Sequence, residues 1–64
     1  MKKEKPKYKI MDRFKLDFTE TIIQITDITT NIEGKIVLHF KSENKEEFKQ
    51  LQSIFINFKF KTKL

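Results

Sequence analysis

The stretch TIIQITDITTNIEGKIVLHFK, residues 21–41, decides the fold of this chain. Its first half is rich in Ile and Thr, whose branched side chains lose rotamer freedom in a helix and pack well on a pleated sheet. Asn31 and Gly34 then mark a turn, because both tolerate turn geometry and glycine reaches positive φ without a Cβ clash. The residues that follow alternate in character, and their apolar face holds Ile36, Leu38 and Phe40. This stretch therefore predicts a β-hairpin.

The first arm of the hairpin carries apolar side chains on both of its faces. Ile23 and Ile25 share one face, whereas Ile22 and Ile28 fall on the other. A strand with one side open to solvent has apolar residues on one face only. The pattern therefore favours a central strand, or a strand whose second face is covered.

Residues 8–18, before the hairpin, also alternate. One parity is apolar and holds Tyr8, Ile10, Phe14, Leu16 and Phe18; the other is polar and holds Lys7, Lys9, Arg13, Lys15 and Asp17. This period of two predicts a strand with one buried face. A helix is the alternative, because Ile10, Phe14 and Phe18 are four residues apart, but Leu16 would then leave the apolar stripe. Met11 and Asp12 break the alternation, which indicates a bulge or the true start of the strand.

The residues after the hairpin predict a helix that begins at Asn44. Asn44 and Glu47 match a capping box, in which each side chain accepts a backbone N–H bond that the first helical turn leaves unmade. Apolar residues then recur at steps of three and four, as on the buried face of a helix. They are Phe48, Leu51, Phe55 and Phe58.

The end of the chain allows two interpretations. Phe58 continues the helical stripe, but residues 56–64 also alternate between apolar residues and Asn57, Lys59, Lys61 and Lys63. Either the helix reaches about residue 58, or it stops earlier and a last strand follows. The clean alternation favours the strand, and helix and strand both stay open for residues 56–63.

These elements predict an α+β fold. We expect a small antiparallel sheet of three or four strands with one helix packed on one face, in the order β-β-β-α, with a final strand as the open alternative. Residues 1–7 are short, charged and interrupted by Pro6, which indicates a flexible basic arm. Residues 8–64 form the single domain.

Length and composition limit the stability and the location of the protein. A chain of 64 residues buries only about 60% of its unfolded surface, and no cysteine is present to add a disulfide. A homo-oligomer is therefore one open way to gain stability. Apolar runs are at most three residues long, so we expect no membrane span and no targeting segment, and the cytoplasm is the expected compartment.

The placement of charge is more informative than its amount. The net charge is +5, but 13 lysines beside one arginine, one glycine and no alanine indicate an AT-rich genome, which inflates lysine. Residues 1–11 carry five lysines and one acid, residues 12–49 carry six basic and eight acidic side chains, and residues 50–64 carry three lysines and no acid. Codon bias does not explain this segregation of charge to the two ends.

The sequence contains no pattern typical of catalysis. His39, the single histidine, is predicted on the outward face of a strand, and Ser42 and Ser53 do not lie in a nucleophile elbow. The carboxylates show no spacing typical of a metal site, and one glycine does not make a phosphate-binding loop. We therefore expect a binding protein that is not an enzyme and that uses no cofactor and no metal.

Two rows of lysines suggest a nucleic-acid-binding accessory protein. If both segments are strands, each presents ammonium groups on one face about 6.6–6.8 Å apart, close to the phosphate spacing of an extended single strand. If the strands are neighbours, the rows form one basic face with an aromatic ring beside it. The alternative is that lysines on edge strands prevent aggregation. The predicted nucleic-acid-binding residues are Lys5, Lys7, Tyr8, Lys9, Lys59, Lys61 and Lys63.

A protein partner is the alternative function. Small chains without catalytic residues, of the kind that phages and mobile elements encode, often inhibit or regulate one host protein. Such a protein would use a sheet edge or an apolar patch with aromatic side chains. The predicted partner is therefore nucleic acid or a single protein, and not a membrane.

Overall fold

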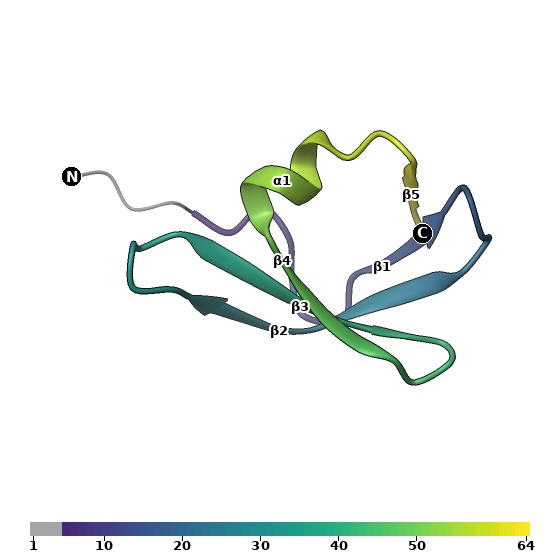
Figure 1. Ribbon diagram of the computed structural model, residues 1–64, viewed down its shortest axis with the longest axis horizontal. Coiled ribbons are helices and arrows are strands. Elements are labelled where there is room, and N and C mark those ends of the chain that lie inside the picture. Colours follow the sequence, from purple (N-terminus) through teal and green to yellow (C-terminus); the bar gives the residue numbers. More distant parts are fainter. Residues whose placement is uncertain (1–4) are drawn as a thin grey trace.

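The computed structural model describes residues 5–64 and shows an α+β fold (Figure 1). Within these residues the elements are β1 (Arg13–Leu16), β2 (Ile22–Thr30), β3 (Ile36–Ser42), β4 (Glu47–Leu51), α1 (Gln52–Asn57) and β5 (Lys61–Lys63). The strands form one sheet in the order β4-β3-β2-β1-β5, and all neighbours are antiparallel. The antiparallel α+β class is confirmed. The predicted strand number and element order are wrong, because the described sheet has five strands and the order is β-β-β-β-α-β.

The predicted hairpin is confirmed as β2 and β3. Its turn is held by Asn31, whose side-chain oxygen accepts hydrogen bonds from the backbone N–H groups of Glu33 (2.9 Å) and Lys35 (3.0 Å). Gly34 has a φ of 80°, the left-handed conformation that glycine adopts without a Cβ clash. The local chemistry of this turn fixes the register of the two longest strands.

A bulge explains why Ile28 falls on the second face in the sequence pattern of β2. The register between β2 and β3 shifts between Ile25 and Asp27. One extra residue moves the following side chains to the opposite face of a strand, so Ile28 joins the core side together with Ile23 and Ile25. β2 also lies centrally in the sheet, as its pattern predicts. The fully buried apolar core consists of Phe14, Ile23, Ile25, Ile36, Leu38, Phe40 and Phe55.

The strand predicted over residues 8–18 is much shorter than expected, because β1 begins only at Arg13. Just before it, the N–H of Met11 donates to the carbonyl of Ile25 (2.9 Å), and the N–H of Ile25 donates to the carbonyl of Asp12 (2.8 Å). Two residues thus face one across the sheet, which is the arrangement of a β-bulge, and Met11 has a positive φ of 83°. The break in alternation at Met11 and Asp12 therefore marks both a bulge and the start of the strand.

The helix predicted from Asn44 is wrong over its first two turns. Ser42 closes a hairpin there: its hydroxyl oxygen accepts the N–H groups of Asn44 (3.2 Å) and Glu46 (3.2 Å), and Lys45 has a φ of 67°. The chain then returns along β3 as β4, which supplies hydrogen-bond partners to the open edge of β3. Phe48, assigned to the helical stripe, instead lies opposite Phe40 and stacks on it at 5.2 Å.

The last segment contains both of the elements between which the sequence left a choice. α1 ends at Asn57, and β5 follows and pairs with β1, with Lys63 opposite Phe14 and Lys61 opposite Leu16. In Figure 1, α1 lies over one side of the bent sheet, between β4 and β5. Within residues 5–64, no helix has the length and apolar character needed to cross a membrane.

Candidate functional site

Lys5 and Lys7 lie on a segment whose backbone is held by the buried side chain of Gln52. Lys5, Lys7 and Lys9 have exposed side chains and belong to no strand. The N–H of Lys7 donates to Oε1 of Gln52 (2.8 Å), and Nε2 of Gln52 donates to the carbonyl of Lys5 (2.9 Å). The amide of Gln52, only 1% exposed, thus offers this backbone one acceptor and one donor, as a neighbouring strand would.

Tyr8 lies against the core of the protein. Its ring meets Phe14 edge to face at 5.3 Å and Phe55 at 5.5 Å. Burial raises the pKa of its hydroxyl, and the nearby Asp12 carboxylate raises it further. The ring expected to stack on a nucleic acid is therefore engaged in core packing.

Asp12 brings the two basic ends of the chain together. One carboxylate oxygen accepts the backbone N–H of Lys9 (2.9 Å) and lies 3.7 Å from Nζ of Lys63. The N–H of Leu64 also donates to the carbonyl of Arg13 (3.0 Å). Lys9 and Lys63, from the two predicted rows, are therefore neighbours.

The C-terminal row is divided between the interior and the surface. Nζ of Lys61 donates to the carbonyls of Ile56 (3.3 Å) and Phe58 (2.5 Å), and it lies 4.9 Å from the centre of the Phe55 ring. A cation is favourable at these carbonyls, because the end of a helix carries partial negative charge. Burial lowers the pKa of Lys61. Lys59 and Lys63 remain exposed.

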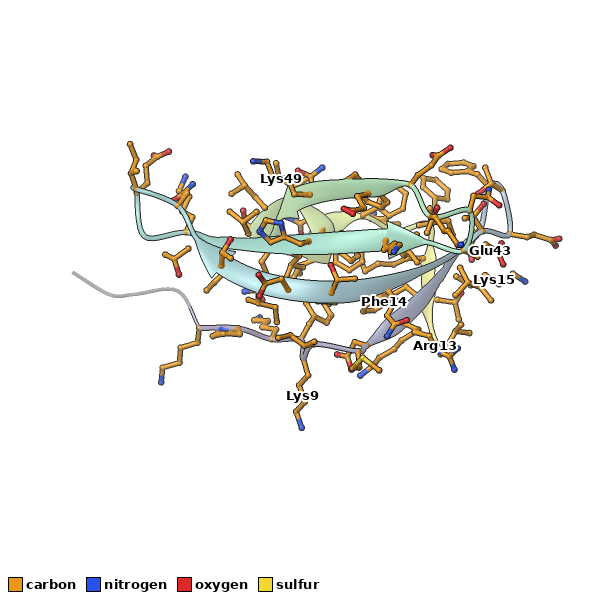
Figure 2. The ribbon with its side chains drawn as sticks, turned by 90° about the horizontal axis from the view of Figure 1, so that it is seen from below. Lys9, Arg13, Phe14, Lys15, Glu43 and Lys49 are labelled. Atoms are coloured by element: carbon orange, nitrogen blue, oxygen red, sulfur yellow. The ribbon has the colours of Figure 1, made fainter. Side chains whose placement is uncertain are left out.

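Sequence reasoning missed Arg13 and Lys15 as functional candidates. Both lie on β1 with alternate parity to the buried Phe14, so they project from the outer side of the sheet. Figure 2 shows Lys9, Arg13 and Lys15 along the same side of the molecule. The polar parity of residues 7–17 already grouped these residues, but the argument followed the lysine-rich ends only. Lys63 lies opposite Phe14 and so starts from the inner face, on β5 at the edge of the sheet. We call Lys9, Arg13, Lys15 and Lys63, which lie around this edge, the basic strip.

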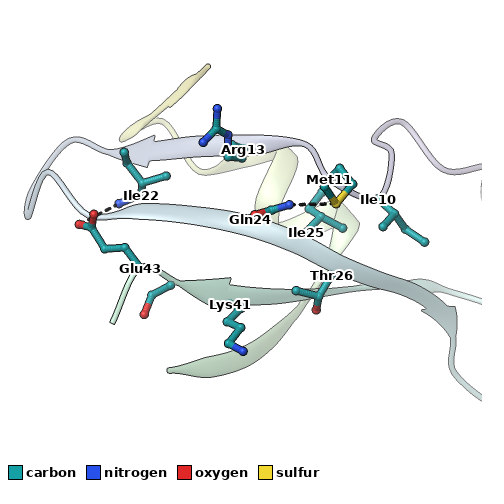
Figure 3. Close-up of a pocket in the computed structure, with 10 residues that line it drawn as sticks. Ile10, Met11, Arg13, Ile22, Gln24, Ile25, Thr26, Lys41 and Glu43 are labelled. Atoms are coloured by element: carbon teal, nitrogen blue, oxygen red, sulfur yellow. Dashed lines mark hydrogen bonds between the residues drawn. The ribbon is translucent and has the colours of Figure 1, made fainter. Parts of the chain in front are cut away.

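An open hollow lies beside the basic strip on the outer side of the sheet (Figure 3). Its volume is about 450 Å³. The register sets Arg13 opposite Gln24 and Gln24 opposite Lys41. The two cationic residues therefore lie on either side of Gln24, with their backbones about 10 Å apart. The hollow also includes one acid, Glu43, whose carboxylate accepts the N–H of Ile22 (3.5 Å).

Exposed phenylalanines gather where β1 ends and β5 approaches. The rings of Phe18 and Phe60 are 4.4 Å apart, and Phe58 lies 6.4 Å from Phe18 and 5.9 Å from Phe60. Phe18 is 69% exposed and Phe60 is 49% exposed. This aromatic cluster, Phe18, Phe58 and Phe60, was not foreseen, because the alternation predicted that Phe18 and Phe60 face the core.

Two further observations bear on catalysis and on metal binding. The ring of His39 contacts the hydroxyl of Thr29 at 2.7 Å. Among the described residues, no group of three or more His, Cys, Asp or Glu side chains could hold a metal ion. Comparison of the chain with protein-family models, with curated proteins and with solved structures found no match.

Proposed function

We propose that this protein is a non-enzymatic accessory protein that binds nucleic acid through the sugar–phosphate backbone. The observation that carries the proposal is the meeting of the two basic ends at Asp12, next to Arg13 and Lys15 on β1. The basic strip is thus assembled from residues more than 50 positions apart. Cations gathered around one edge of a small domain are the electrostatic footprint of a phosphate-binding surface.

The strip favours backbone contacts over reading of bases. Arg13 is the only arginine of the chain, and bidentate recognition of bases relies mainly on arginine. Lysine ammonium groups neutralise phosphates and release counterions without regard to sequence. Four such contacts give a slope of about −3 in a plot of log affinity against log salt, or about 50-fold weaker binding at 200 than at 50 mM salt.

Fluorescence anisotropy with labelled single-stranded and duplex oligonucleotides, at about 50 and 200 mM salt, tests the proposal. The test variant carries Arg13→Gln, Lys15→Gln and Lys63→Gln. The control carries Lys35→Gln, Lys45→Gln and Lys49→Gln, which removes the same charge from exposed positions elsewhere. We expect the test variant to lose affinity and most of the salt dependence, and the control to keep both. No binding at the lower salt concentration, or an equal loss in both variants, contradicts a localised phosphate-binding surface.

A second candidate function, binding to one protein partner, is favoured by an apolar hollow of about 180 Å³ between β4, α1 and β1. Phe48 and Ile54 line it and are substantially exposed. Exposed apolar surface beside an edge strand such as β4 is typical of protein interfaces. This candidate predicts a stoichiometric complex with a single protein, which Ile54→Ser weakens and the basic-strip variant leaves unchanged.

A further inference from the structure

We infer that the nucleic acid is single-stranded, and that Phe18 and Phe60 form a platform on which its bases stack. This inference rests on the proposed function and names its ligand class. It is carried by the exposure of two phenylalanine rings beside the strand that bears Arg13 and Lys15.

The orientation of the last segment is the opposite of what core formation favours. The amphipathic pattern of residues 56–64 predicts phenylalanines inside and lysines outside. Instead Lys61 turns towards Phe55 and the carbonyls at the end of α1, while Phe60 is left 49% exposed. Exposing a large apolar ring gives up burial energy, so an exposed pair of rings indicates a surface that is covered by something else.

The aromatic cluster is continuous with the cations of β1. Lys15 lies opposite Thr62, and the N–H of Asp17 donates to the carbonyl of Phe60 (2.9 Å). The pairing of β1 with β5 therefore extends from Lys15 to the two adjacent rings, which are tilted by 37° to each other. Lys59, exposed between Phe58 and Phe60 in the sequence, adds a cation at the cluster.

This combination fits a single strand better than a duplex. In a duplex the base faces are stacked on one another and only their edges are accessible. In a single strand the base faces are free to stack on aromatic side chains, while the phosphates contact nearby cations. Arg13 and Lys15 are two residues apart on one strand, which separates them by about 6.6–6.8 Å.

The charge around the rings also decides between the possible occupants. A second copy of the chain would bring its own Lys15 and Lys59 towards the same two cations, and like charges repel. The acid next to Phe18, Asp17, accepts the hydroxyl of Thr62 (3.1 Å). An anionic strand complements both the rings and the cations. Self-association through the aromatic cluster is therefore the competing outcome of the experiment.

The experiment compares three labelled probes by anisotropy: an oligothymidylate of about 12 nucleotides, an abasic strand of equal length, and a duplex. The abasic strand keeps the phosphates and lacks the bases. The test variant, Phe18→Leu with Phe60→Leu, keeps apolar bulk and removes the aromatic faces. Ile32→Ala, a fully exposed apolar position in the β2–β3 turn, is the control. Circular dichroism checks that each variant is folded, and sedimentation at two concentrations reports self-association.

We expect the wild type to bind oligothymidylate at least about 5-fold more tightly than the abasic strand, given the typical strength of base–aromatic stacking. The Leu variant should bind both strands equally, at the affinity of the wild type for the abasic strand, and Ile32→Ala should match the wild type. Equal binding of both strands by the wild type overturns the stacking platform and leaves phosphate binding intact. Loss of self-association in the Leu variant, with the preference for oligothymidylate retained, also overturns it and assigns the cluster to a dimer interface. Failure of the wild type to bind any probe overturns the proposed function as well.

Discussion

The two lysine-rich ends of the chain have the same spacing of charge and very different structures. Lys5 and Lys7 lie outside any strand, and their backbone is held by the amide of Gln52. At the other end, Lys61 and Lys63 lie in β5, where one ammonium group is turned inward and the other is exposed. Lysine at every second position is therefore compatible with an irregular segment and with a strand.

The difference shows what decides the position of a lysine in a small domain. The side chain of Lys61 is drawn inward because the carbonyls of Ile56 and Phe58 need donors. Among the described residues of the other end, the side chains of Lys5, Lys7 and Lys9 meet no such acceptors and remain at the surface. The available backbone partners, and not the spacing of the residues, separate a structural lysine from a candidate binding lysine.

The largest expected effect is the loss of stability when the hydrogen bonds from Gln52 to the N-terminal segment are removed. Gln52→Ala removes both hydrogen bonds to the segment and leaves a buried cavity, so we expect the free energy of unfolding to fall by about 1–3 kcal/mol. Urea unfolding measures this loss, and amide hydrogen exchange at Lys7 should become faster. Gln50→Ala, at an exposed position on β4, is the control and should change stability by less than about 0.5 kcal/mol. Unchanged exchange at Lys7 would contradict the attachment.

The next largest effect is a difference in pH dependence: Tyr8 at one end and Lys61 at the other should change stability in opposite directions as the pH rises. The pKa of Tyr8 is raised above its ordinary value of 10.0, so the stability it adds is complete below pH 10.0 and is lost as the pH rises through the raised pKa. The pKa of Lys61 is lowered below 10.5, so its contribution is present above pH 10.5 and is lost as the pH falls through the lowered pKa. As the pH rises through the alkaline range, Tyr8 therefore lowers the free energy of unfolding, whereas Lys61 raises it.

Two variants separate these contributions. Tyr8→Phe should gain stability relative to the wild type between about pH 8 and about pH 11, whereas Lys61→Met should lose stability relative to the wild type over that range. Urea unfolding at both pH values measures each difference. Because Tyr8 is the only tyrosine, its pKa is also read directly from tyrosinate absorbance. A Tyr8 pKa at or below 10.0 would remove the basis of the first expectation.

The smallest expected effect concerns the ion pair between Asp12 and Lys63, which joins the two ends of the chain. A double-mutant cycle of Asp12→Asn with Lys63→Gln should give a coupling of about 0.2–1 kcal/mol, as exposed ion pairs do, and the coupling should shrink as salt increases. The matching cycle with Lys59→Gln should give no coupling, because the ion pair of Asp12 is with Lys63. Equal couplings in the two cycles would mean that Asp12 senses only the overall charge.

The hairpin of β2 and β3 could be predicted because its signals are local. Asn31 and Gly34 define the turn, and the alternation of Ile36, Leu38 and Phe40 defines the buried face. The short β5 was favoured for the same reason. The β-bulge at Met11 and Asp12 was also visible as a break in the pattern, although its pairing with Ile25 was not.

Residues 44–51 could not be predicted correctly, because the same sequence fits both the start of a helix and a hairpin that leads into β4. Asn44 and Glu47 match a capping box, but the Ser42 hydroxyl instead accepts the N–H groups of Asn44 and Glu46 and closes a hairpin. The deciding factor is the open edge of β3, which needs backbone partners, and this is a property of the folded sheet. Phe48 satisfies the helical spacing and the cross-strand contact with Phe40 equally well.

The candidate site was predictable in part. The sequence located basic residues at both ends, but it did not show that Asp12 joins Lys9 to Lys63. It assigned Lys61 to the surface and Phe60 to the core, since alternation specifies two faces without specifying which of them is buried. The pairing of β5 with β1 decides this, and that pairing is a long-range contact.

The same pairing has a consequence for how the chain folds. β5 and β1 close the sheet between opposite ends of the described sequence, whereas β2, β3 and β4 pair only with strands that are next to them in the chain. Closing a long loop costs more entropy than closing a hairpin, so distant pairs form late when local pairs suffice as a nucleus. We therefore expect the β2–β3–β4 meander to assemble first and β5 to dock last. The basic strip and the aromatic cluster would then be completed only in the final folding step.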